Sequence, residues 1–186
     1  MTRHRIRITL ITVFVTTIGL QAADLALLDG YGDTKWGQSA EEVQSAIVDL
    51  EEIKGEPLIL RQAGKDGEII QKTEYAFTED QLLHVSVYFK MPDAPARGKD
   101  KDGLRYIKEQ LDAKYKAVRK EFNNAGIRVS AGANATGHVV VSYHNTKIEN
   151  EIVKRRRAEA KEAKEKEYQE GERHKKMTET GVGDLL

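Results

Sequence analysis

The chain has 186 residues, enough for one domain and an appendage, with 30 basic side chains, 30 acidic side chains and no cysteine. A balanced charge lacks the long-range positive field from which nucleic-acid-binding proteins gain most of their non-specific affinity, so no nucleic acid is expected as a partner. The absence of cysteine excludes disulfides, thiol nucleophiles, thiolate metal sites and a lipid-modified N-terminal cysteine.

The first 23 residues have the features of a secretory signal peptide, in the required order. Three arginines precede an apolar run at residues 8–20, and the small residues Ala22 and Ala23 follow it. A run of 13 residues is shorter than the roughly 20 that span a bilayer, so we expect cleavage after Ala22 or Ala23 and no retained membrane anchor. The mature chain, with 27 basic and 30 acidic side chains, is then expected in the periplasm or outside a bacterial cell.

A helix is expected after a glycine-rich lead that predicts a loop or a short strand. Ser39 and Glu42 have the spacing of a capping box, in which each side chain bonds the backbone N–H of the other. Apolar side chains then recur at helical spacing as far as Leu50. We expect Gly55 and Pro57 to end this helix.

Three strand-like runs follow, at residues 58–61, 69–77 and 82–90. The short turns between them predict an antiparallel meander. In the third run the apolar residues alternate with a second set, so one face is expected in the core and the other partly in water. The residues assigned to the wetter face are Leu82, His84, Ser86, Tyr88 and Lys90.

The second half repeats the order of helix and strands. After a polar loop at residues 91–103, apolar side chains at intervals of three and four from Leu104 to Phe122 predict one amphipathic helix, which Asn123, Asn124 and Gly126 stop. Two more strands are expected at residues 127–131 and 138–148.

This order predicts a two-layer α+β domain at residues 24–148. Its antiparallel sheet of four to five strands is expected to carry two helices on one face.

The composition changes sharply after this domain. Residues 149–177 place opposite charges at helical neighbours, for example Glu162 with Lys166, which predicts a charged, solvent-exposed helix interrupted at Gly171. Such a helix could form a coiled coil or contact the cell envelope. Residues 178–186 are expected to be a disordered tail.

No group of residues carries a clear catalytic or metal-binding signature. His84, His138 and His144 fall on predicted strands, but residues 138 and 144 would lie about 20 Å apart on one strand, too far for one ion. Residues 98–109 match part of the calcium-loop pattern but lack the carboxylate at its first position. No nucleophile elbow or complete nucleotide-binding fingerprint occurs. We therefore expect no metal and no cofactor, and an enzyme is the less favoured class.

The residues most suited to binding are few. His84 and Tyr88 lie on the wetter face of the sheet, and Trp36 stands at a helix entrance, where a packing role is the more common one. The basic run could contact an anionic surface, or could be a solvated helix face that does nothing measurable. It consists of Lys154, Arg155, Arg156 and Arg157.

Residues 36–57 resemble the opening of small exported bacterial domains. Trp36-Gly37-Gln38-Ser39, followed by Glu42-Val43 and then Gly55-Glu56-Pro57, is similar to a turn that starts a helix ending at G-x-P. The β-lactamase-inhibitor protein and the small lipoprotein of the outer-membrane assembly machinery are of this type. The resemblance implies an α+β fold that binds proteins without catalysis, and the missing cysteine excludes the lipid tether.

These observations favour an exported, non-enzymatic module that binds another envelope or secreted protein. The alternative is a small periplasmic hydrolase or ligand-binding protein with a site between the sheet and loop 91–103. A deep pocket would favour the alternative, and an exposed sheet face or edge would favour protein binding.

Overall fold

A computed structural model of the protein describes residues 25–90, 101–134 and 138–179. The chain divides into two compact units, residues 1–148 and 149–186, which are described separately. The predicted signal peptide, most of the predicted loop before the second helix and the end of the predicted tail lie outside the described residues.

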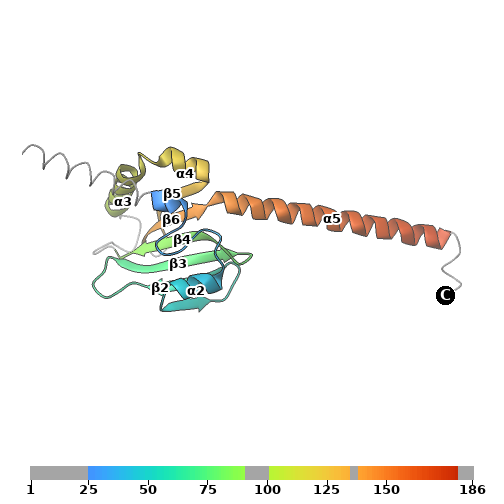
Figure 1. The fold of residues 1–186 in the computed structure, drawn as a ribbon, viewed down its shortest axis with the longest axis horizontal. Helices are drawn as coiled ribbons and strands as arrows, with labels where there is room; N and C mark the ends of the chain where they lie inside the picture. Colours follow the sequence, from blue (N-terminus) through green and yellow to red (C-terminus); the bar gives the residue numbers. More distant parts are fainter. Residues whose placement is uncertain (1–24, 91–100, 135–137, 180–186) are drawn as a thin grey trace, which may run out of the picture. The chain divides into compact units, whose positions relative to one another are not determined.

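The described part of the first unit is built on one antiparallel sheet of six strands, in the order β1-β2-β3-β4-β6-β5 (Figure 1). The sequence therefore predicted the α+β class correctly but too few strands. The strands are β1 (Leu50–Ile53), β2 (Leu58–Ala63), β3 (Ile70–Thr78), β4 (Gln81–Phe89), β5 (Ile127–Ala133) and β6 (Val139–Asn145).

The first predicted helix begins as expected but ends early. α2 (Ala40–Ala46) follows a complete capping box, in which the Glu42 N–H donates to Ser39 Oγ (3.2 Å) and the Ser39 N–H donates to Glu42 Oε2 (2.8 Å). Ile47 is already extended, and Asp49 has a positive φ of 59°. Because two β-branched residues follow the helix, helical geometry is disfavoured there and the chain turns into β1.

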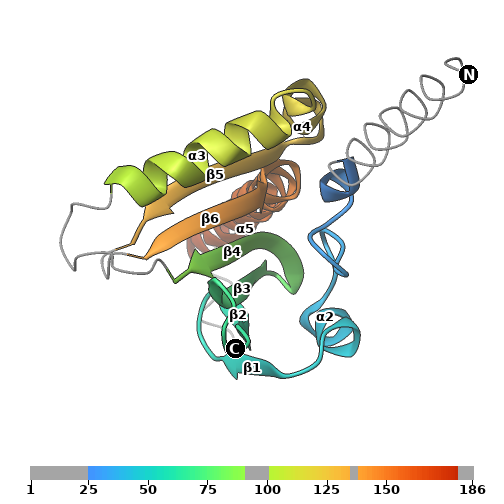
Figure 2. The same ribbon diagram turned by 90° about the vertical axis from the view of Figure 1, so that its left-hand side faces the viewer.

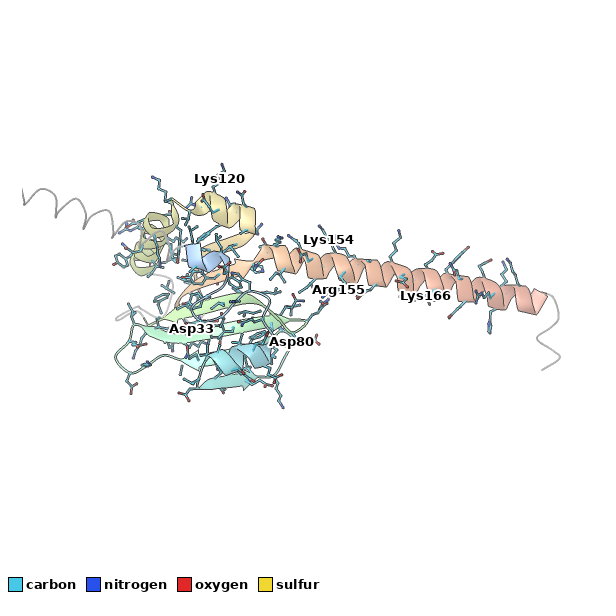
Figure 3. All side chains as sticks on the ribbon, in the orientation of Figure 1. Asp33, Asp80, Lys120, Lys154, Arg155 and Lys166 are labelled. Atoms are coloured by element: carbon cyan, nitrogen blue, oxygen red, sulfur yellow. The ribbon has the colours of Figure 1, made fainter. Side chains whose placement is uncertain are left out.

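A two-residue turn joins β3 to β4, and both of its residues have positive φ (50° and 56°), as in the turns that favour tight hairpins. This turn also holds the start of α2. Asp80 Oδ1 accepts the Ala40 N–H (2.9 Å), and Asp80 lies beside α2 in Figure 3. The Gly37 N–H donates to the Leu82 carbonyl (3.0 Å), and the Leu82 N–H donates to the Gln38 carbonyl (2.8 Å).

A β-bulge follows the turn in β4. Phe77 pairs with Leu82, but the next residue, Ala76, pairs with His84, so Leu83 is the extra residue. Both leucines are buried, with Leu82 fully so. The prediction that Leu82 lies on the wetter face is therefore wrong, because simple alternation does not hold through a bulge.

The long helix predicted at residues 104–122 is two helices, α3 (Lys101–Tyr115) and α4 (Arg119–Ala125). Neither proline nor glycine marks the break at residues 116–118, where Val118 (φ −107°, ψ 9°) leaves helical geometry. Gly126 ends α4 as predicted, with a left-handed φ of 74°, whereas Asn123 and Asn124 lie within the helix that they were expected to stop. Both helices lie along β5 (Figure 2).

The core lies against one face of the sheet. Leu60, Tyr75, Val85 and Tyr143 form one row across four strands on this face, and all are buried. A short 3-10 helix, η1 (Ala26–Leu28), together with α2, α3 and α4 adds buried side chains to the same cluster. Burying each large apolar side chain stabilises the fold by about 1.5–3 kcal/mol. The side chains from these helices are Leu27, Val43, Tyr115 and Phe122.

The second unit consists of the greater part of α5 (Thr146–Glu179), a helix of 34 residues and about 51 Å. Its side chains at residues 153–171 are exposed, and Lys166 pairs with Glu162 at 2.8 Å (Figure 3). Gly171 does not interrupt it, since one glycine costs only about 1 kcal/mol relative to alanine. Among the described helices, none is both long and apolar enough to span a bilayer.

Candidate functional site

The face of the sheet opposite the core carries polar side chains, and we call it the polar face. Residues of one face recur at every second position along a strand, and the register aligns them across strands. One polar row crosses all six strands. It consists of Glu51, Arg61, Glu74, Ser86, Ser142 and Ser130.

Glu74 is the centre of a hydrogen-bonded network on this face. Its Oε1 accepts from Arg61 Nε (3.0 Å), Arg61 Nη2 (2.8 Å) and Lys72 Nζ (2.7 Å), while its Oε2 accepts from Tyr88 Oη (2.7 Å). The Glu74 side chain is only 12% exposed. Burial opposes its ionisation, but the hydrogen bonds from Lys72, Tyr88 and Arg61 outweigh burial and lower its pKa. The network therefore holds an ionised carboxylate in a fixed position.

Tyr88 is fixed by the same network. Burial, together with the hydrogen bond to the Glu74 carboxylate and its charge, raises the pKa of Tyr88 to about 12. Lys72 Nζ lies 4.1 Å from the centre of the Tyr88 ring, within the range of a cation–π contact. The Tyr88 phenol thus stays protonated at neutral pH and presents a rigid aromatic ring on the polar face.

Two of the three histidines of the predicted strands are brought together. His84 on β4 pairs directly with His144 on β6, with ring centres 5.5 Å apart, and His84 Nε2 lies 3.4 Å from Ser86 Oγ. His138 lies one residue before β6, where its N–H donates to Asn134 Oδ1 (2.9 Å). Among the described residues, no group of three or more His, Cys, Asp or Glu side chains could hold a metal ion.

A cavity of about 700 Å³ lies beside β5, within the first unit. It is lined by residues of α3, α4 and three strands, and the site predicted between the sheet and loop 91–103 stays untested. Residues 91–100 of that predicted loop lie outside the described residues. The lining residues are His84, Leu111, Asp112, Tyr115, Arg119, Phe122, Asn123, Ile127, Arg128, Val129, Ser130, Ser142 and His144.

The remaining predicted binding residues lie elsewhere. Trp36 packs against the core and its Nε1–H donates to the Leu27 carbonyl (2.9 Å), which is a packing role. The basic run at residues 154–157 is exposed on α5, in the second unit (Figure 3). The structure thus places His84 and Tyr88 on the polar face of the first unit, and does not bring Trp36 to that face.

Sequence reasoning missed Glu74, its two basic partners and the pairing of His84 with His144. A signal was present, because Lys72 and Glu74 alternate with Thr73 and Tyr75 along one strand. The residue of β4 that lies opposite Glu74 could not be predicted from the sequence, because this pairing depends on the bulge in β4.

Comparison with protein-family models, with curated proteins and with solved structures finds no match. The resemblance of residues 36–57 to small exported domains therefore stays a prediction. In the structure Gly55-Glu56-Pro57 lies between β1 and β2, whereas the pattern was expected to end a helix.

Proposed function

We propose that this protein is an exported, non-enzymatic module that binds another envelope or secreted protein through the polar face of its sheet. The observation that carries the proposal is the network around Glu74. Four charged or aromatic side chains from three adjacent strands are locked together by four hydrogen bonds on a partly exposed surface. A pre-organised surface loses little side-chain freedom on binding, which favours affinity.

The chemistry of this surface suits a protein partner. Arg61 and Tyr88 belong to the residue types that dominate protein–protein interfaces, and both are partly exposed here. Towards β6 and β5, the polar row consists of serines. Because these side chains are small, the backbone or a side chain of another protein can approach the sheet closely there.

Site-specific photo-crosslinking tests this binding surface. A photoreactive residue at position 59 or 140, beside Arg61 and Tyr88 on the polar face and outside the network, is expected to give discrete adducts in an envelope fraction. The same residue at Asp66, in the exposed β2–β3 turn, is expected to give none. Equal adducts from all three positions, or none from positions 59 and 140, would contradict the proposal. Neither test position lines the cavity beside β5.

Export has its own test. The full chain, expressed in a Gram-negative host, is expected to yield periplasmic protein whose N-terminus is Ala23 or Asp24, by N-terminal sequencing. Recovery of the chain only from the cytosol, with Met1 and its leader intact, would overturn this part of the proposal.

The cavity beside β5 is the one observation that favours the alternative, a small hydrolase or ligand-binding protein. Its volume of about 700 Å³ falls in the range of small-molecule sites. A thermal-shift screen against a metabolite set, followed by turnover assays on any hit, tests this alternative. A saturable small-molecule ligand would favour it over protein binding.

A further inference from the structure

The outer edge of β5 is a free sheet edge within the described residues. β5 lies at the end of the strand order and pairs only with β6. In an antiparallel pair, alternate residues of an edge strand direct their N–H and C=O groups away from the neighbouring strand. No described residue forms a backbone hydrogen bond with this outer side. Such a row of backbone groups is a template for another strand.

The cavity beside β5 passes over this edge. The cavity is lined by Ser142 and His144 on the polar face of β6, and also by Tyr115 and Phe122, which belong to the core on the opposite face. A cavity can touch both faces of a strand only by extending around its edge. The free backbone groups of β5 therefore border a space of about 700 Å³.

The two walls of the cavity differ in chemistry. On the helical side, Leu111 of α3 and Phe122 of α4 give an apolar wall. On the side of the polar face, Arg128, His144 and His84 form one row across β5, β6 and β4. A strand added along β5 would direct its alternate side chains to these two walls.

The charge on the polar wall of the cavity indicates which side chains a ligand would carry on that side. The acidic residue of the cavity, Asp112, is bound by Arg119, whereas Arg128 has no hydrogen-bond or ion-pair partner among the described residues. An exposed guanidinium in a groove is complementary to a carboxylate, which it can bind in a bidentate manner.

We propose that the groove along β5 binds an extended segment of a partner protein, which adds to the sheet as a seventh strand. The segment carries alternating apolar and acidic side chains, with the apolar ones against α3 and α4 and an acidic one on Arg128. Backbone hydrogen bonds supply affinity, and the two walls supply specificity. This site is distinct from the network around Glu74, so either proposal can fail alone.

A synthetic peptide of alternating valine and glutamate residues is the probe, titrated into the mature chain and followed by NMR. Saturable binding is expected, with the largest shifts and slowed amide exchange at residues 127–133. A valine–lysine peptide is expected to bind about threefold more weakly or worse. A valine–glutamate peptide N-methylated at every amide is expected not to bind, because neither of its edges can then donate hydrogen bonds to β5.

Charge reversal in the protein completes the test. Arg128→Glu is expected to invert the preference between the two peptides, while Arg173→Glu, an equal charge change on exposed α5, leaves it unchanged. Four results would each overturn the proposal. They are no saturable binding, shifts centred away from β5, equal binding of both peptides, and an edge already occupied by a second copy of the chain in sedimentation experiments.

Discussion

At the scale of single residues, one carboxylate differs from the many others in this highly charged chain. Glu74 accepts hydrogen bonds from three side chains on three strands, whereas most other carboxylates of the described residues are exposed. Its ionisation is therefore coupled to folding, because the network exists only when the strands are in register.

Replacing Glu74 with glutamine is expected to lower the free energy of unfolding by about 1 kcal/mol at pH 7, below the ~1.5–3 kcal/mol typical of bonds to charged groups, since its cationic partners are partly exposed. The pKa of Glu74 is lowered from its ordinary 4.5, so the stabilisation is complete above about that pH and is lost as the pH falls through the folded-state pKa. Urea denaturation of both proteins at several pH values measures this. The control, Glu68→Gln in the exposed β2–β3 turn, should show no such pH dependence.

At the scale of elements, the sequence predicted what is encoded locally. Ser39 with Glu42 predicted the start of α2, and Gly126 predicted the end of α4, because caps act within one turn of a helix. The pairing of Glu74 with Ser86 could not be predicted. Counting from the two-residue turn would pair Glu74 with Val85, and the bulge at Leu83 shifts the register by one residue.

The difference between local signals and contacts between distant segments also explains the other wrong predictions of helix bounds. Leu50 continues a helical spacing, but β1 gains its hydrogen bonds from β2, a contact that a periodicity within one segment does not contain. Likewise the apolar stripe from Leu104 to Phe122 is real, and the break at residues 116–118 leaves both halves in contact with the core. No local feature of the sequence marks that break.

Replacing glycine with alanine is expected to have opposite effects on stability at two positions. Gly126→Ala is expected to destabilise the first unit by about 1–3 kcal/mol, because φ is 74° and an added Cβ would lie 2.9 Å from Lys147. Gly171→Ala should instead raise the helicity of α5, since an added Cβ meets nothing within 4 Å and alanine is favoured by about 1 kcal/mol. Circular dichroism melts of the two variants measure both effects. A Gly126→Ala protein as stable as the parent would contradict the left-handed geometry.

At the scale of the whole molecule, the two units are stabilised by different physics. The first has a core built between helices and a sheet, whereas α5 has exposed side chains from residue 153 to residue 171 and depends on local pairs such as Glu162 with Lys166. Pairs of this kind contribute only about 0.2–0.5 kcal/mol each and weaken in salt.

Truncating the chain after Ala158 is therefore expected to leave the first unit folded, with a melting temperature within about 3 °C of the parent. Differential scanning calorimetry of the parent and truncated chains measures this. A much larger decrease would show that the distal part of α5 supports the first unit. A change in sedimentation coefficient beyond that due to the lost mass would show that it mediates self-association.

The contacts at the β3–β4 turn also set an order of assembly. Residues 37, 38 and 40 bond to residues 80 and 82, which are made some forty positions later. A chain that crosses a membrane from its N-terminus cannot complete these bonds until the hairpin has followed. Under the proposed export, the first residues of the domain would therefore stay unfolded until residues 80–82 had also crossed the membrane.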